Sequence, residues 1–249
     1  MDGLLTRVRQ LPGAPWVLRT GSKGLQRFRS MARSLRENPP SWWQILALGL
    51  FVRFLLAPYS MQADLVVDGR ATLTMVYGGG PYTYPIIYPP GFSYLLNAEG
   101  RALAILYAPS TFLAPNSALL TRHAWLGFIQ PSYVPGPGYA IAEKAPLFLF
   151  DLLTGILLSV IVKERGGSEA TSRLVFALWF LNPLTIVESS LHGAFDTIPT
   201  FFLLATLYLL LHDRSLVAGV ALALGTALKI FPAVFIPLLL ACLVLRYRA

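Results

Sequence analysis

The sequence predicts an all-α, polytopic membrane protein folded as a helical bundle of about six spans. Of its 249 residues, 55% are hydrophobic and only 13% are charged, and the mean hydropathy is +0.59. A soluble domain carries about 25% charged residues. The apolar residues also fall into long runs, so we expect one continuous membrane domain over residues 42–249.

A basic tail is predicted over residues 1–41. It holds eight of the twenty Lys and Arg residues, directly before the first apolar run. The positive-inside rule therefore places the N-terminus in the cytoplasm, next to anionic lipid headgroups. This placement accounts for much of the net charge of +8, so we expect no nucleic-acid partner. The late apolar run indicates a retained anchor rather than a cleaved signal peptide.

The spans are read from the apolar runs in chain order. The first, over 42–58, begins with two tryptophans suited to the interface and carries Arg53 in its outer half. The stretch "LKIFPAVFIP" divides the last run into two spans near residues 229–232. The later runs cover 146–162, 174–191, 198–211 and 216–245, and the last of these counts as two spans, which makes six in total.

The segment 59–143 is predicted to be a long first extracytoplasmic loop. Its apolar run 91–108 is short and contains Asn97, Glu99 and Arg101, which favours an amphipathic helix in the membrane interface over a span. The alternative, a span here, would invert every later segment and place the basic stretch "KERGGSEATSR" outside.

Polar residues gather at the outer face of this predicted topology. A charge at the centre of a span costs at least about 2.5–3.5 kcal/mol, so such residues persist where they pair or line a wet cavity. Their convergence predicts an outward-facing polar cavity, although Arg53, Asp151 and Lys229 could instead pair with one another or reach toward the interface. The residues concerned are Arg53, Asp64, Asp68, Asp151, Glu188, His192, Asp196 and Lys229.

The chemistry of these residues suggests a lipid-linked substrate. Lys229 and Arg53 suit the phosphate of a lipid carrier whose hydrocarbon chain lies in the bilayer. Asp64 or Asp68, at the water boundary, could act as a general base on an acceptor hydroxyl. The alternative for both is an exposed loop, with Asp68 and Gly69 forming a turn.

The stretch "YGGGPYTYPIIYPPG" ends near Tyr88 and predicts a semi-rigid rim that could stack on a sugar. The alternative is an aromatic belt at the interface. The stretch lacks the Lys-Ser/Thr of a phosphate-binding loop. Metal-ligand spacings, a Ser/His/Asp arrangement and a dinucleotide fingerprint are also absent from the sequence, and Cys242 is the only cysteine. We therefore expect no metal and no cofactor.

An ordered set of motifs resembles one family of membrane enzymes. The motifs are "MQADL", "YPPGFSYLL", "KAPLFLFDLLTGILL", "FLNPLTIVESSLHGAFDTIPTFFLL" and "ALGTALKIFPAVFIPLLL". Together with the first span they cover residues 42–245 and resemble the GT-C superfamily of glycosyltransferases that use polyprenyl-phosphate sugars. The resemblance is greatest to the first mannosyltransferase of GPI-anchor synthesis and its prokaryotic relatives.

The resemblance implies a site and a substrate. It implies a long first outer loop with interface helices and Asp64 as the base that moves a sugar, most simply mannose, from a polyprenyl- or dolichyl-phosphate carrier to a glycolipid or glycan acceptor. Asp196 would support the sugar or acceptor site, His192 would line the same cavity, and Lys229 would face the carrier phosphate. The implied membrane is that of the endoplasmic reticulum or the plasma membrane of a prokaryote.

Two departures from the family pattern are visible. The family often has a paired acidic motif, whereas Asp64 and Asp68 are four residues apart, and its members usually have more than six spans. The chain could be a compact member or a fragment. The alternative function is that of a non-catalytic, lipid-binding membrane subunit, because the PIG-U-like subunit of the GPI transamidase shares the architecture.

Overall fold

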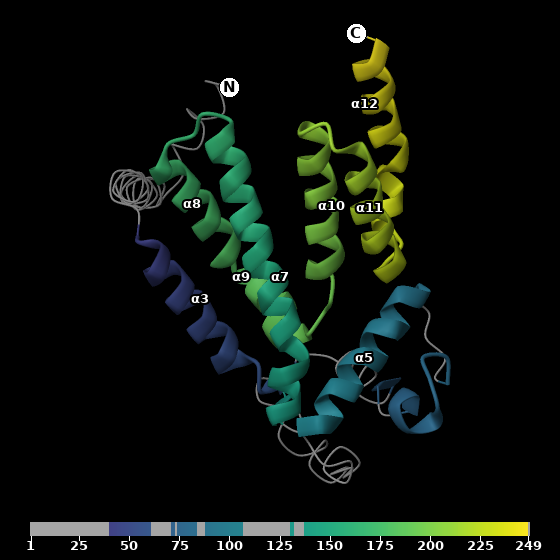
Figure 1. Ribbon diagram of the computed structural model, residues 1–249. Coiled ribbons are helices and arrows are strands. Elements are labelled where there is room, and N and C mark those ends of the chain that lie inside the picture. Colours follow the sequence, from purple (N-terminus) through teal and green to yellow (C-terminus); the bar gives the residue numbers. More distant parts are fainter. Residues whose placement is uncertain are drawn as a thin grey trace, which may run out of the picture.

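A computed structural model of the chain describes residues 40–60, 71–72, 74–83, 88–106, 130–131 and 137–248. These residues are almost entirely helical, which confirms the all-α prediction (Figure 1). The one sheet among them pairs β1 (Tyr59–Ser60) with β2 (Gln130–Pro131), antiparallel and two residues long. Asp64, Asp68 and the tail 1–39 lie outside the described residues.

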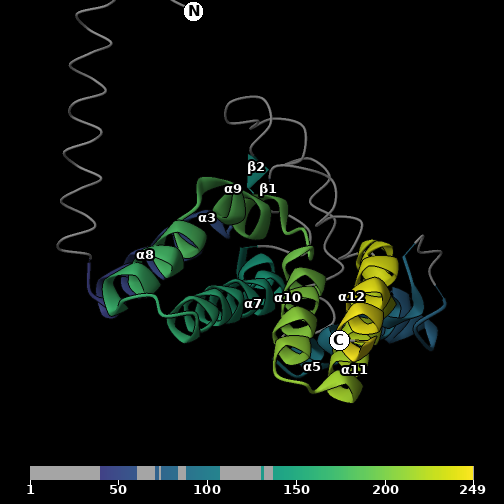
Figure 2. The same ribbon diagram turned by 90° about the horizontal axis from the view of Figure 1, so that it is seen from above.

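The helices form two groups that meet near one end of the molecule (Figures 1 and 2). The first group contains α3 (Trp42–Leu56), α7 (Pro137–Glu164) and α8 (Glu169–Phe180). Ser41 caps α3 through a capping box with Gln44, and Ser168 caps α8. A small core of Ile45, Phe176 and Phe180 joins α3 to α8.

The second group contains α10 (Thr197–Leu211), α11 (Ser215–Leu228) and α12 (Ile236–Arg248). Helices α10 and α11 pack along each other, and α10 also packs on α7, which connects the two groups. The short 3-10 helix η2 (Phe231–Phe235) separates α11 from α12, with Pro232 in its first turn. The predicted break near residues 229–232 is therefore confirmed.

One predicted span is broken. Helix α8 ends at Phe180, Asn182 caps the four-residue α9 (Pro183–Ile186), and the π-helix η1 (Val187–His192) follows. Pro183 stands at the first position of α9, where its missing N–H is not needed. The axis bends by 44° between α8 and the segment Pro183–His192. The bend carries η1 toward the start of α10 and the site described below.

Helix α5 (Pro90–Leu106) lies obliquely across the end where the two groups meet (Figure 1). It contacts both α11 and α7. A helix therefore does form in the segment predicted to be amphipathic, while its position in a membrane interface stays a prediction. Helix α7 begins nine residues before the predicted start at residue 146, because Pro146 is accommodated inside the helix.

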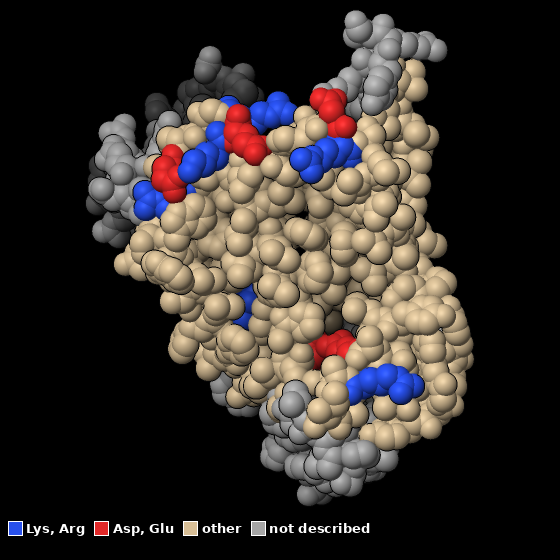
Figure 3. All heavy atoms as spheres, viewed as in Figure 1, with Lys and Arg blue, Asp and Glu red and all other residues tan. Residues whose placement is uncertain are grey.

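The surface of the molecule fits a bilayer. Figure 3 shows Lys, Arg, Asp and Glu gathered at the end where α7 meets α8 and α10 meets α11, and again near α5, with few charged side chains on the surface between. Large apolar side chains on α3, α11 and α12 are exposed there, among them Phe51, Leu55, Val220, Leu224 and Leu238. The chain is an integral membrane protein by this apolar surface.

Helix length identifies one or two membrane spans. Among the described residues, one helix segment, Ala140–Glu164, is both long and apolar enough to cross a membrane, and the bent pair α8 with Pro183–His192 would make a second if it crosses as one unit. The helices α3, α10 and α11 are apolar but shorter than a typical span. Six spans therefore stay a prediction.

Candidate functional site

A sharp turn at residues 193–196 brings the opening of α10 to the centre of the site. Gly193 ends η1 with a left-handed backbone, φ 71°, a conformation that glycine adopts without steric cost. His192, just before it, places Nδ1 3.0 Å from Oε2 of Glu188. The imidazole of His192 therefore pairs with Glu188, whereas the carboxylate of Asp196 pairs with Lys229.

Lys229 is the partner of Asp196. Helix α11 ends at Leu228 and Lys229 adopts an extended backbone, which releases its side chain from the helix. Its Nζ donates a hydrogen bond of 2.5 Å to Oδ1 of Asp196, and the side chains are 28% and 44% exposed, respectively. The pair is thus accessible to a solute, and an anion could compete with Asp196 for the ammonium group.

Three aromatic rings surround this ion pair. Phe92 and Phe195 stack with their centroids 3.8 Å apart, and Tyr88 meets both edge-on, at 4.8 and 5.1 Å. Lys229 Nζ lies 5.7 Å from the Tyr88 centroid and 5.1 Å from that of Phe195, within the range of cation–π attraction. The structure therefore brings together three of the predicted site residues, Tyr88, Asp196 and Lys229.

An apolar groove of about 730 Å³ adjoins this cluster. Tyr88, Pro89 and Pro90 form one wall, at the start of α5. The other wall comes from α11 and the segment after it: Gly219, Leu222, Ala223, Thr226, Ala227, Ile230 and Ile236. Because Tyr88 contributes to both the groove and the surroundings of Lys229, an apolar chain in the groove would end close to a cation.

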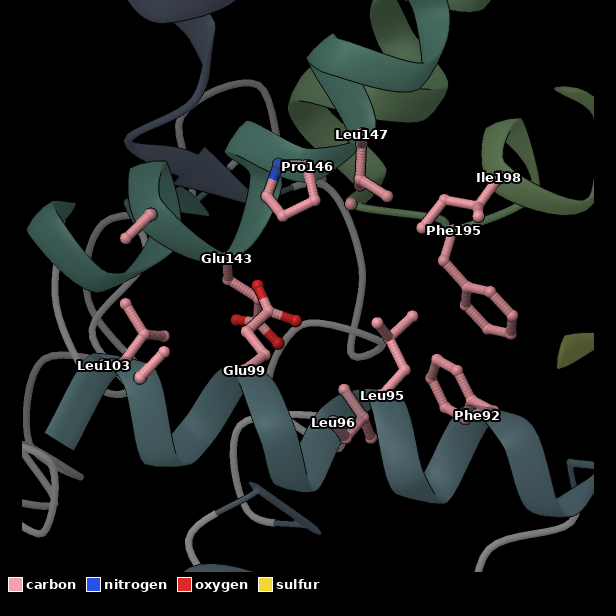
Figure 4. Close-up of a pocket in the computed structure, with 13 residues that line it drawn as sticks. Phe92, Leu95, Leu96, Glu99, Leu103, Glu143, Pro146, Leu147, Phe195 and Ile198 are labelled. Carbon is pink, nitrogen blue, oxygen red and sulfur yellow. The ribbon is translucent and has the colours of Figure 1, made fainter.

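A second, smaller cavity of about 300 Å³ lies between α5 and α7 (Figure 4). Most of its walls are apolar, but Glu99 from α5 and Glu143 from α7 direct their carboxylates toward each other inside it (Figure 4). Phe92 and Phe195 also line this cavity, so the aromatic stack stands between it and the surroundings of Lys229. The sequence prediction did not include Glu99 or Glu143 among the site residues.

Arg53 and Asp151 do not line an open cavity, as the sequence analysis expected, but are buried. Both side chains are 0% exposed, and Arg53 Nη2 lies 2.9 Å from Asp151 Oδ2. The guanidinium also donates to the backbone carbonyls of Gly49 and Phe180 and stacks 4.1 Å from the Phe180 ring. The structure thus shows the pairing alternative for these two residues, because burial in a dry helix interface favours a charge that carries its own counter-ion.

Lys144 is a further buried cation, which the sequence analysis did not place among the site residues. Its side chain is 0% exposed, and Nζ donates to three backbone carbonyls, those of Ala57, Tyr59 and Ser190, at 2.6–3.0 Å. The ammonium thereby joins the end of α3, strand β1 and η1. No sequence pattern predicts these contacts, because the carbonyls that accept from Lys144 belong to residues up to 87 positions away in the chain.

The chain is similar to known proteins of GPI-anchor synthesis. The family described as "GPI transamidase subunit PIG-U" matches residues 104–249. "GPI mannosyltransferase 1" of Candida albicans is 30% identical over 173 residues, which cover 64% of this chain and 44% of that protein. "GPI mannosyltransferase 1" of Kluyveromyces lactis is 33% identical over 93 residues, 37% of this chain and 22% of that protein.

A vertebrate protein is also similar. "GPI alpha-1,4-mannosyltransferase I, catalytic subunit" of Danio rerio is 30% identical over 92 residues, 36% of this chain and 23% of that protein. The chain spans less than half the length of these curated relatives. No solved structure gives a significant match.

The apolar surface of the helical bundle defines an integral membrane protein. Within that class, the chain belongs to the PIG-U family. The resemblance to the first mannosyltransferase of GPI-anchor synthesis, predicted from the motifs, is confirmed by the curated relatives.

Proposed function

We propose that the chain acts as a membrane mannosyltransferase, moving a sugar from a polyprenyl- or dolichyl-phosphate carrier to a glycolipid or glycan acceptor on the extracytoplasmic face. The names of the curated relatives support mannosyl transfer. The observation that carries the proposal is the position of Lys229, an accessible ammonium beside an apolar groove.

The donor would lie along this groove. The carrier chain would occupy the apolar walls between α5 and α11, and its phosphate would meet Lys229 close to Tyr88. A phosphate oxygen accepts a charge-assisted hydrogen bond from an ammonium group, so it can replace Asp196 as the partner of Lys229. Asp196 would hold the ammonium in place until the donor arrives.

The transfer itself would be one displacement at the anomeric carbon of the sugar. Asp64 would take the proton of the acceptor hydroxyl while that oxygen attacks, and the carrier phosphate would leave toward Lys229. A single displacement inverts the configuration at that carbon. Asp68 is the second candidate for the base. His192, held by Glu188 beside the turn, would border the sugar.

The roles of Arg53 and Asp151 are different in this proposal. Their buried pair fixes α3 against α7 and the end of α8. We therefore propose that both residues position the helices, and that Lys229 is the cation that binds the donor phosphate.

A second candidate function is favoured by the family match itself. The matching family is described as a transamidase subunit rather than a transferase. In that case the groove and Lys229 would bind a lipid phosphate without any sugar transfer. Binding and turnover must therefore be measured separately.

The test compares Lys229→Met with Lys229→Arg in proteoliposomes supplied with a radiolabelled polyprenyl-phosphate mannose. Loss of one charge-assisted hydrogen bond costs about 1.5–3 kcal/mol, so donor binding by Lys229→Met should weaken about tenfold to a hundredfold. Lys229→Arg should retain part of the binding because it keeps the charge. Lys163→Met is the matched control, because Lys163 also pairs with a carboxylate but is 65% exposed at the opposite end.

The outcomes separate the two functions. Transfer of mannose by the wild type, reduced in Lys229→Met and unchanged in Lys163→Met, supports the transferase. Donor binding that depends on Lys229 with no transfer under any condition supports the non-catalytic subunit. Equal donor binding by the wild type and Lys229→Met contradicts the site in both functions.

A further inference from the structure

Asp196 stands directly before α10, at the N-cap position, but its side chain does not cap the helix. An aspartate at this position usually accepts a hydrogen bond from the second or third N–H of the helix. Here the carboxylate makes no such bond, and its Oδ1 instead accepts from Lys229 Nζ at 2.5 Å. The negative charge of Asp196 is therefore directed at the ammonium group that we propose binds a lipid phosphate.

The pair gives the described site no net charge. Lys229 contributes one positive charge and Asp196 one negative charge, and the neighbouring rings of Tyr88 and Phe195 add none. Further cations of the described chain direct their hydrogen bonds to other groups: Arg53 to Asp151, Lys144 to backbone carbonyls, and Arg101 to Asn97. A phosphate that binds Lys229 therefore also meets a carboxylate.

Such a pair favours a ligand with one negative charge over a ligand with two. The attraction to Lys229 grows in proportion to the charge of the ligand, and the repulsion from Asp196 grows in the same way and offsets much of it. The free energy that is needed to take the ligand out of water, beside the apolar wall of the groove, grows with the square of its charge. A dianion therefore loses more in desolvation than it gains in attraction.

The loaded and the spent forms of a lipid carrier differ in this charge. A carrier that holds a sugar is a phosphodiester with one negative charge. Transfer breaks the bond between the anomeric carbon and the phosphate oxygen, which keeps the electron pair, while the acceptor proton goes to the base. The spent carrier is thus a phosphomonoester, with a charge of about −1.5 to −2 at neutral pH.

We infer that Asp196 makes the site around Lys229 selective for lipid phosphodiesters over lipid phosphomonoesters. The inference rests on the proposed function, in which Lys229 binds the phosphate. In a transferase this selectivity admits the loaded carrier and expels the spent one, because the repulsive carboxylate acts most strongly on the dianion. In a non-catalytic subunit it selects a lipid whose phosphate carries a head group. Asp196 is then a residue that determines specificity, and Lys229 supplies the affinity.

The experiment compares farnesyl methyl phosphate, a diester, with farnesyl phosphate, a monoester of the same chain, by calorimetric titration of the purified full chain in detergent. Lys229→Met measures the background of lipid that enters the micelle. At about pH 8 the monoester carries two charges, and the wild type should bind the diester about threefold to tenfold more tightly.

A change of pH separates the charge of the lipid from its shape. At about pH 5, below the second phosphate pKa of about 6, both lipids carry one charge, so the ratio of their affinities should approach one. The ratio removes any effect of pH on the protein that both lipids share, including effects at His192 and Glu188 beside the turn. This measurement needs no substitution at Asp196, so it does not depend on how a variant folds.

Asp196→Asn keeps the size of the side chain and removes its charge. No cap hydrogen bond is lost, so α10 should stay folded. Both lipids should bind more tightly because Lys229 is released, and the monoester should gain more, which lowers the diester preference at about pH 8 to about one or below. Glu169→Gln is the matched control: Glu169 is 50% exposed and pairs with Lys163 at 3.1 Å, so its loss should leave the ratio unchanged.

Three results would each overturn the inference: equal binding of the two lipids at about pH 8, a diester preference that persists at about pH 5, and an unchanged ratio in Asp196→Asn. A persistent preference would show that the site recognises the methyl group rather than the charge. Equal binding by the wild type and Lys229→Met would refute the phosphate site of the proposed function, and the selectivity with it. A wild type that shows the selectivity but never transfers mannose would refute the transferase and leave the role of Asp196 intact.

Discussion

Two ion pairs of the same chemical type differ in how they can be used. Arg53 and Asp151 are both 0% exposed, and the guanidinium is further held by two carbonyls. Lys229 and Asp196 are 28% and 44% exposed, and Lys229 lies 5.7 Å from the ring of Tyr88, which lines the apolar groove. An exposed pair can exchange one partner for a ligand at small cost, whereas a buried pair cannot. Exposure therefore separates Lys229, which we propose binds the donor, from Arg53 and Asp151, which we propose position the helices.

The buried pair gives a stability prediction. Arg53→Met leaves the Asp151 carboxylate buried without its counter-ion, which should destabilise the fold by about 3–5 kcal/mol. The double variant Arg53→Met/Asp151→Leu removes both charges and should recover most of that loss. Thermal unfolding in detergent measures both. A double variant as unstable as the sum of the two single variants would show that the residues act independently.

The proposed base gives a prediction on turnover. Asp64→Asn keeps the shape of the side chain and removes its basicity, so transfer should fall by about 10²–10⁴ while the fold survives. Asp68→Asn should be milder, because asparagine also suits a turn before glycine. Mannose transfer and donor binding are measured on the same preparations. Turnover by Asp64→Asn equal to that of the wild type would exclude Asp64 as the base.

At the scale of elements, the approach of α5 to α11 shapes the groove. A Cβ on Gly91 would lie 2.5 Å from the carbonyl oxygen of Ala227, so only glycine allows this contact. Gly91→Ala should therefore push α5 away from α11 and lower the free energy of unfolding by about 1–3 kcal/mol. Gly219→Ala is the control, since a Cβ there meets nothing within 4 Å. Equal thermal stability of the two variants would contradict this packing.

Some of the helix boundaries were predictable from the sequence, and others were not. Pro232 signals the break between α11 and α12, and the apolar runs locate α3 and α10, because these features are local. The start of α7 is missed, since a proline inside a helix looks like a boundary. The bend at α9 and the π-helix η1 are missed too, because the local signals of the break, Asn182 and Pro183, lie inside a continuous apolar run.

The site was predictable only in part for the same reason. The accumulation of charges in apolar runs identifies Lys229 and Asp196 as unusual, and the structure pairs them. Glu143 and Lys144 stand at the boundary between the predicted outer loop and the next predicted span, and no sequence pattern singles them out. Their roles depend on segments far away in the chain, α5 for Glu143 and the carbonyls of Ala57 and Ser190 for Lys144. Such partners become visible only once the helices are placed.

At the scale of the whole molecule, the charges divide into two regions. Lys163, Arg165 and Arg173 lie near the α7–α8 connection, at the end where Figure 3 shows the denser group of charged side chains. Helix α5, which contributes residues to the cavity that Glu99 and Glu143 line, lies at the opposite end (Figure 1). Since basic residues concentrate on the cytoplasmic side, the site should face the extracytoplasmic side.

Cysteine labelling tests this orientation. In a Cys242→Ser background, Ala98→Cys on α5 and Arg165→Cys after α7 each place one thiol at an exposed position. A membrane-impermeant maleimide added to intact cells should label Ala98→Cys directly and Arg165→Cys only after permeabilisation, because about 30 Å of hydrocarbon would separate the two ends. The background variant without cysteine controls for non-specific labelling. Labelling of both positions from the same side would contradict the bundle's orientation across the membrane, and the reverse pattern would place the proposed site around Lys229 on the cytoplasmic side.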